Sequence, residues 1–228
     1  GIAVGMACNI CSFNLAELCA TTVALMKDEK HDISTTMPAP DFVGGGQILY
    51  DEAQMRDIFE NGRGSVKVRA RWRHLPKENI IEIYEIPYST TVEAVIDKVA
   101  ELVKAGKLRE VADMRDETDL NGLKLTLDLK RGVDADKLMA KLFKTTPLED
   151  SFSCNFNILV SGQPRVMGVR EILKEWTAFR VECVRRRTYY DLHGKEKRLH
   201  LLQGLAAILL DIDKAIKIIR TCLLYTSP

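Results

Sequence analysis

The sequence has no long hydrophobic run and few cysteines or histidines, and these absences exclude several classes of protein. No apolar stretch approaches the roughly 20 residues that a membrane-spanning helix needs, so we expect no membrane partner. Six cysteines in 228 residues are too few for a disulfide-built secreted domain, which indicates a reducing, cytoplasmic compartment. The four histidines are scattered, and Cys8-x-x-Cys11 has no second ligand pair at metal-binding spacing. We therefore predict no metal site.

The sequence also lacks a complete catalytic set. It has no Ser/His/Asp or Cys/His arrangement in a supporting context, no glycine-rich phosphate loop and no paired carboxylates. An enzyme complete within these residues is the least favoured interpretation, and we assign no catalytic residue to the chain. The net charge of +1 is unevenly distributed, because basic residues are scarce before residue 60 and concentrated in 165–200. Such local basic character fits a nucleic-acid surface.

The clearest pattern is an alternating basic stretch that follows the turn at 62–64. Apolar and basic residues alternate from 66 to 73, which is typical of a strand with one buried and one exposed face. The apolar face has Val66, Val68, Ala70 and Trp72, and the exposed face has Lys67, Arg69, Arg71 and Arg73. A row of cations on a rigid strand fits a phosphate backbone. Alternatively, these charges pair with Glu82 and Glu85 of the following strand.

Periodicity and capping residues predict an α+β fold. Helices are predicted at 15–27, 52–60, 91–105 and 135–143. Strands are predicted at 47–50, 65–73, 80–86, 108–115, 123–129 and 152–160. The strands at 65–73 and 80–86 should form a hairpin, and the order of elements favours a mainly antiparallel sheet with its helices on one face. From 169 to 220 apolar residues recur every three or four positions, which predicts long helices that begin a coiled-coil arm, with a candidate kink at His193-Gly194.

Seven motifs occur in order along the chain. They are Gly1-Ile-Ala-Val-Gly-Met-Ala7, Gly62-Arg-Gly-Ser-Val-Lys-Val-Arg-Ala-Arg71, Glu85-Ile-Pro-Tyr88, Met114-Arg-Asp-Glu-Thr-Asp119, Gly162-Gln-Pro-Arg165, Arg186-Arg-Thr188 and Asp211-Ile-Asp213. Together they resemble the A subunit of bacterial type IIA topoisomerases, that is, DNA gyrase or topoisomerase IV. The chain departs from the pattern of that family at 11–14, where Cys-Ser-Phe-Asn replaces Pro-Pro-His-Asn, and at 89–92.

The resemblance implies an internal fragment of a longer enzyme. Residues 1–30 would end the DNA-cleavage domain, 31–168 would form an α+β tower domain, and 169–220 would begin the coiled-coil arm. Separately from the resemblance, the abrupt break in the helical pattern at the end of the chain predicts that 221–228 are a non-native tail. The implied partners are double-stranded DNA, a second A subunit in the full-length enzyme, and the topoisomerase B subunit. ATP and Mg²⁺ are expected on the B subunit, with no cofactor in this chain. The catalytic tyrosine of the family lies upstream of Gly1, so we expect the fragment alone to be inactive.

The resemblance also implies residues that contact DNA. Ile2 matches the isoleucine that the family inserts between base pairs to bend the duplex. In the same context Lys67, Arg69 and Arg71 become candidate phosphate contacts. A second basic cluster at 185–187 fits a solvated helix face better than a binding site, and the carboxylates at 113–119 fit a charged turn. The competing interpretation is a non-catalytic module that binds nucleic acid or a partner helix.

Overall fold

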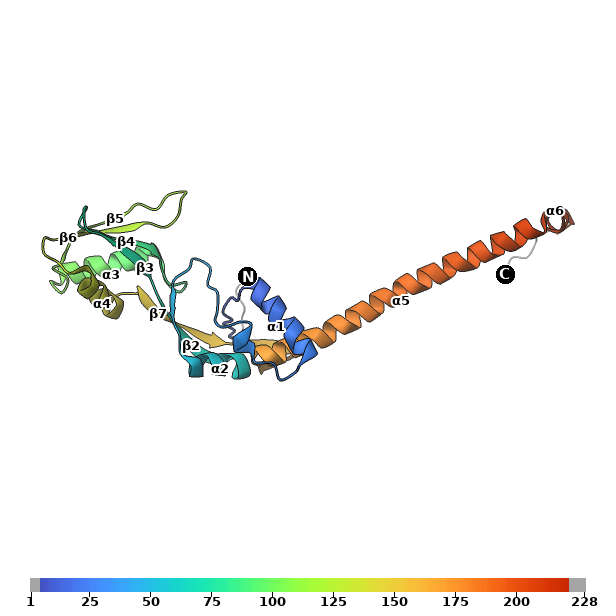
Figure 1. The fold of residues 1–228 in the computed structure, drawn as a ribbon, viewed down its shortest axis with the longest axis horizontal. Coiled ribbons are helices and arrows are strands. Elements are labelled where there is room, and N and C mark those ends of the chain that lie inside the picture. The colour runs from blue at the N-terminus through green and yellow to red at the C-terminus, as the bar shows by residue number, and fades with distance from the viewer. Residues whose placement is uncertain (1–4, 222–228) are drawn as a thin grey trace. The chain divides into compact units, whose positions relative to one another are not determined.

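The computed structural model describes residues 5–221, and the chain divides into two compact units between Lys174 and Glu175 (Figure 1). The helices of the first unit are α1 (Leu15–Lys27), the 3₁₀ turn Ile33–Thr35, α2 (Glu52–Asn61), α3 (Val92–Lys104) and α4 (Ala135–Thr145). Its strands are β1 (Gln47–Leu49), β2 (Arg63–Arg69), β3 (Arg71–Leu75), β4 (Ile80–Glu85), β5 (Val111–Asp116), β6 (Leu125–Leu129), β7 (Glu149–Asn155), β8 (Asn157–Val160) and β9 (Gln163–Val166). Helix α5 (Val169–Leu210) begins in this unit, and α6 (Ile212–Thr221) follows it. The α+β fold with antiparallel sheets and a long C-terminal helix is confirmed.

The four predicted helices are confirmed. They could be predicted because a capping side chain marks the first residue of each helix. The side chains of Asn14, Asp51, Thr91 and Asp134 accept hydrogen bonds from backbone N–H groups of the first turn, as N-caps do. For example, Asn14 Oδ1 lies 3.0 Å from the nitrogen of Ala16. The four helices begin and end within two residues of the predicted positions.

The basic stretch differs from the prediction, because it forms two strands in two sheets. Strand β2 is the central strand of the sheet β1-β2-β7, whereas β3 is an edge strand of the sheet β3-β4-β6-β5. Ala70 lies at the change of sheet and donates its N–H to Leu148 O (2.7 Å), and the register shifts between Arg71 and Trp72. The predicted hairpin is therefore correct only for β3 and β4. The alternation holds, because Val66, Val68 and Ala70 are all buried.

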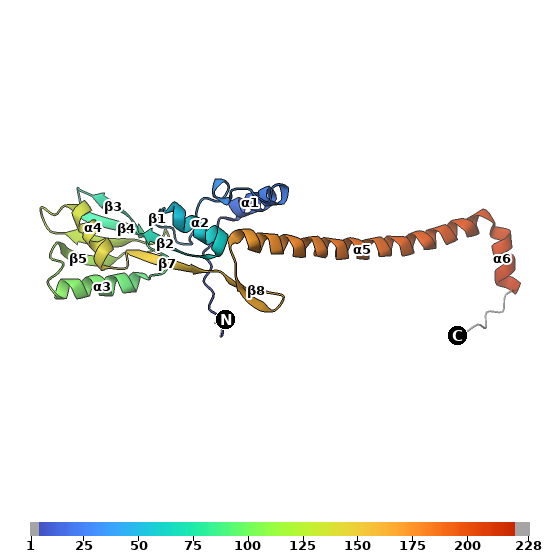
Figure 2. The ribbon, with the colours of Figure 1, turned by 90° about the horizontal axis from the view of Figure 1, so that it is seen from below.

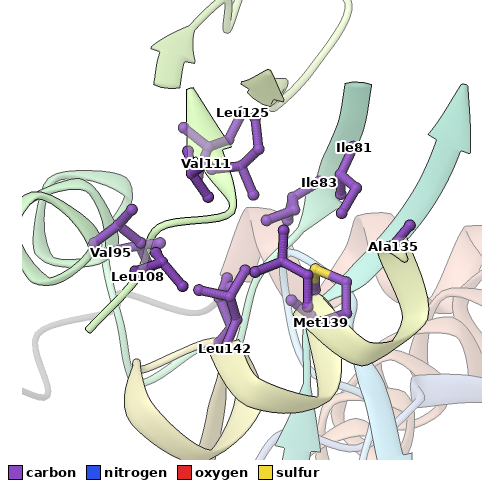
Figure 3. Close-up of a cluster of buried hydrophobic side chains, with 14 of the residues drawn as sticks. Ile81, Ile83, Val95, Leu108, Val111, Leu125, Ala135, Met139 and Leu142 are labelled. Atoms are coloured by element: carbon purple, nitrogen blue, oxygen red, sulfur yellow. The ribbon is translucent and has the colours of Figure 1, made fainter. Parts of the chain in front are cut away.

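Two hydrophobic clusters lie on either side of Ala70. The first, which we call the α3/α4 core, joins one face of the four-stranded sheet to α3 and α4. In Figure 3, Ile81, Ile83 and Leu125 of the sheet face Met139 and Leu142 of α4. This arrangement confirms that both helices cover one sheet face. The second, the β2/β7 core, contains Cys11, Ile33, Met37, Phe42, Met55, Ile58, Phe59, Val66, Val68, Phe152, Cys154, Phe156, Val169 and Leu173.

Two glycines bring the start of β2 close to the start of α5. Gly62 ends α2 with φ 68°, and a Cβ atom there would lie 2.1 Å from Met167 O. At Gly168 a Cβ atom would lie 2.3 Å from Glu60 O. Arg170 reinforces this contact: its Nε and Nη2 donate to the Glu60 carboxylate at 3.1 and 2.8 Å, and Nη1 donates to Glu29 O at 2.8 Å. The base of α5 is thus fixed to α2.

Two further predictions need adjustment. The strand predicted at 152–160 is interrupted at Phe156, whose N–H donates to Gly62 O (2.8 Å), so that β7 and β8 belong to different sheets. Strand β8 pairs with β9 through a two-residue turn in which Ser161 and Gly162 both have positive φ, as in type I′ hairpins. Helix α5 continues through His193-Gly194 without interruption and ends before Asp211. No helix within residues 5–221 is long and apolar enough to cross a membrane.

Candidate nucleic-acid interface

The outward face of the sheet β1-β2-β7 carries a small polar surface around Lys67. Because side chains alternate along a strand, Arg63, Ser65, Lys67 and Arg69 lie on the face opposite to buried Val66 and Val68. Strand β7 runs antiparallel beside β2, as Figure 2 shows, with Ser153 opposite Ser65 and Ser151 opposite Lys67. On its other side Lys67 lies opposite Leu49 of β1, and the lysine is exposed. We call Arg63, Ser65, Lys67, Ser151 and Ser153 the β2/β7 polar face.

Lys67 is the exposed cation at one end of this face, opposite Ser151. It forms no ion pair with any residue in the part of the chain that the structure describes, and the same holds for exposed Arg63. An unpaired surface lysine keeps its full charge available for an anion. Phosphate groups accept hydrogen bonds from lysine ammonium groups and from serine hydroxyls alike. The arrangement is chemically suited to hold a phosphate without reading a base.

The two predicted arginines differ from Lys67, because each is paired with a carboxylate. Arg69 Nε donates to Glu149 of β7, and its guanidinium lies 5.1 Å from the centre of the Phe143 ring. Arg71 Nη1 lies 3.3 Å from Glu85 Oε1. The alternative that the sequence left open, pairing with the following strand, is therefore confirmed for Arg71. Glu149 is 80 positions from Arg69, and no sequence pattern indicated this partner.

Arg73 is also paired, and more tightly. Its Nε and Nη2 each lie 2.9 Å from an oxygen of Glu82, whose side chain is only 6% exposed. The hydrogen bonds to Glu82 raise the pKa of Arg73 above its usual value. A two-point pair with a buried carboxylate fixes the guanidinium on the sheet. Pairing with Glu82 and Glu85 thus accounts for the arginines of β3. On β2, Arg69 pairs with Glu149, whereas Lys67 has no such partner among the residues that the structure describes.

The remaining candidates lie elsewhere. Ile2 is outside the described residues. Arg186 lies 3.9 Å from Glu182 on the exposed surface of α5, in the second unit. The carboxylates of the turn after β5 bond within that turn: Asp119 Oδ1 accepts from the nitrogen of Asn121 at 2.8 Å, and Glu117 Oε2 lies 2.7 Å from Lys124 Nζ. These hydrogen bonds lower the pKa of both carboxyl groups.

No group of three or more His, Cys, Asp or Glu side chains within residues 5–221 is arranged to hold a metal ion. The candidate site is the β2/β7 polar face. Alternation along the strand predicted which face carries Lys67. The serines of β7 were missed, because only the β2–β7 register brings them beside the lysine.

Comparison with known proteins gives a consistent result. A family model that describes the A subunit of DNA gyrase/topoisomerase IV matches residues 1–224. The chain is 38% identical to the DNA gyrase A subunit of Halalkalibacterium halodurans, over 97% of this chain and 27% of that protein. It is 37% identical to the DNA gyrase A subunit of Synechocystis sp., over 96% and 27%. The A subunit of DNA topoisomerase 4 from Escherichia coli is 38% identical over 96% of this chain and 30% of that protein. The chain spans less than a third of the length of these relatives.

Proposed function

The chain belongs to the A-subunit family of DNA gyrase and topoisomerase IV, and from this premise we propose that it holds and bends duplex DNA within a type II topoisomerase. The complete enzyme cuts both strands of one duplex, passes a second duplex through the gap and reseals the break, driven by ATP. The B subunit binds ATP and Mg²⁺, and a second A subunit completes the assembly. The enzyme works in the cytoplasm.

The regions of the chain divide this work. Residues 1–30 end the DNA-cleavage domain, 31–168 form the tower domain, and 169–220 begin a helical arm. Exposed apolar side chains on α5 and α6, such as Leu202, Leu209 and Ile216, support the arm, since they form the stripe that a partner helix would cover. The transesterification occurs outside these residues, so the fragment alone is inactive.

The observation that carries the proposal is Lys67 on the β2/β7 polar face, which forms no ion pair within residues 5–221. Lys67 contacts a phosphate directly, whereas Arg69 and Arg71 contribute through the guanidinium N–H groups that their carboxylates leave free. Contacts of this kind are independent of sequence and fix the position of a duplex. Ile2 acts as an apolar wedge between base pairs at the bend. Unstacking one step costs on the order of a few kcal/mol, which the wider contact of the bent duplex offsets.

A salt titration tests the proposal. Fluorescence anisotropy measures the affinity of the 228-residue chain for a labelled duplex of arbitrary sequence between low and high salt. We expect weak binding whose logarithm falls linearly with the logarithm of salt concentration, with a slope of about −0.9 per phosphate neutralised. Affinity that does not change with salt would reject the proposal.

The wedge requires a separate test in the full-length complex. Ile2→Ala should reduce DNA bending, measured by energy transfer between dyes at the two ends of a duplex, while most of the affinity remains. Unchanged bending would reject the role of Ile2 and leave the proposal for Lys67 standing.

A further inference from the structure

Two cysteines meet inside the β2/β7 core. Cys11 precedes α1 and is 3% exposed, and Cys154 lies in β7 and is 5% exposed. Both belong to the same buried cluster. The chain brings them together from positions far apart in sequence. Hydrogen bonds between Asn9 and Asn155, N to O at 2.9 and 2.8 Å, hold the segment before Cys11 antiparallel to β7.

The two thiols have different environments. The neighbouring Cys11, through its thiol and its backbone N–H, favours the thiolate form of Cys154. These two donors lower the pKa of Cys154 below its usual value. The same contact and burial raise the pKa of Cys11. Of the two thiols, Cys154 therefore has the greater tendency to ionise.

We propose that Cys11 and Cys154 form an oxidisable dithiol site that hydrogen peroxide converts into a disulfide between the N-terminal segment and β7. First, the Cys154 thiolate attacks one peroxide oxygen, the O–O bond breaks, and the departing hydroxide takes a proton to form water. Cys154 is then a sulfenic acid. Next, the sulfur of Cys11 attacks the sulfur of Cys154, the S–O bond breaks, and the proton of Cys11 leaves with the hydroxide as a second water. Two thiols lose two electrons, and one peroxide gains them.

Access to the buried pair comes from the N-terminal segment. Residues 5–14 form no helix, and their only β-bridge is the pair of Asn9 with Asn155. Backbone hydrogen bonds tie this segment down at Asn9 and Ser12, but they form no continuous ladder, so the segment opens more readily than the strands of the sheet. Brief opening admits a small oxidant, and the disulfide then prevents further opening. Oxidation therefore fixes the chain that leads into α1 to the strand beside β2.

Peptide mapping of the 228-residue chain tests the site. The reduced chain is freed of reductant and treated with increasing hydrogen peroxide, and the remaining thiols are alkylated with N-ethylmaleimide in denaturant. Digestion without reductant should give one cross-linked peptide pair that contains Cys11 and Cys154 and disappears on treatment with dithiothreitol. The midpoint of thermal unfolding of the oxidised chain should rise, because a cross-link between distant residues restricts the unfolded chain.

Control variants separate this pair from other cysteines. Cys8→Ser and Cys19→Ser change exposed cysteines and should leave the cross-link unchanged. Cys154→Ser should abolish the cross-link and leave Cys11 free to be alkylated. The yield of the cross-link is also compared between the folded and the urea-unfolded wild-type chain. This comparison does not depend on whether the variants fold. Equal cross-linking in both states, or cross-links spread evenly over other cysteines, would overturn the proposal. The test reads no DNA binding, so its outcome is independent of the proposed function.

Discussion

The role of Lys67 can be tested by two substitutions that change the charge of strand β2 and its surroundings in opposite directions. Lys67→Gln removes an exposed cation that has no ion pair among the described residues, so the folded chain loses no internal contact of that kind. Glu149→Gln removes the carboxylate that neutralises Arg69, and so returns one positive charge to the same strand. The two substitutions change the net charge by equal amounts. If β2 binds phosphates, the first should weaken binding of DNA and the second should strengthen it.

The size of the effect follows from counterion release. Each lost phosphate contact reduces the slope of log affinity against log salt by about 0.9. When the salt concentration rises fourfold, the affinity of each chain for DNA falls by some factor. That factor should be about 3.5 times smaller for the Lys67→Gln chain than for wild type. Its stability should stay within about 0.5 kcal/mol of wild type, as is usual for exposed surface positions. Glu149→Gln should make the dependence of affinity on salt steeper, by at most about 0.9 in the slope. The reason is that the side chain of Arg69 is 39% exposed and can reach an anion once Glu149 no longer neutralises it.

The assay is fluorescence anisotropy on the wild-type chain and three variants with the same duplex at several salt concentrations. Lys77→Gln is the matched control, because Lys77 is an exposed lysine in the turn between β3 and β4, outside the β2/β7 polar face. Equal loss of slope in Lys67→Gln and Lys77→Gln would mean that DNA responds only to total charge. That result, or unchanged binding by Glu149→Gln, would refute the reasoning for this surface.

Three further predictions concern stability. Leu127→Ala in the α3/α4 core, where Leu127 is 0% exposed, should lower the free energy of unfolding by about 3–5 kcal/mol in urea titrations; a loss below about 1 kcal/mol would contradict the packing. Gly168→Ala should lower the midpoint of thermal unfolding, because the new Cβ would lie 2.3 Å from a carbonyl oxygen of α2. Gly194→Ala is the control and should not lower the midpoint, because a Cβ there would meet open space. Equal shifts in the two variants would argue against the close contact at Gly168. Glu110→Gln removes the pair with Lys141 (2.7 Å), which lowers the pKa of Glu110. Since a depressed pKa stabilises the fold above the unfolded value near 4.5, the variant should be less stable at neutral pH and match wild type in strong acid; a difference that is constant with pH would contradict this.

Much of the fold could be predicted because its signals are local. The side chain of Asn14 or Asp134 caps its own helix, so the sequence alone contains both the cap and the first turn. Alternation along 66–72 likewise reports which residues are buried, without knowledge of the neighbouring strands. The change of sheet at Ala70 was not predictable in this way. It depends on the hydrogen bond with Leu148, and the apolar period runs through the change unaltered.

The candidate site shows the same division between local and distant information. The exposed side of Lys67 followed from the period of the strand. Whether its neighbours were paired depended on β7, which returns to β2 from about 80 residues later in the chain and brings Glu149 to Arg69. Pairing of Arg71 with Glu85 was one of the two alternatives that the sequence left open, because the two strands are joined by a short turn. Charge patterns therefore located the cations, and tertiary pairing decided which of them remain free.

The change of sheet at Ala70 has a consequence for how the first unit melts. Val66 and Val68 are buried in the β2/β7 core, whereas Ala70 and Trp72 contribute to the α3/α4 core. The same continuous stretch of backbone therefore belongs to both cores. Neither core can unfold without disrupting the stretch 66–72, on which the packing of the other core depends. The two cores should consequently melt in one cooperative transition, and a truncation that removes either should leave the other unable to fold.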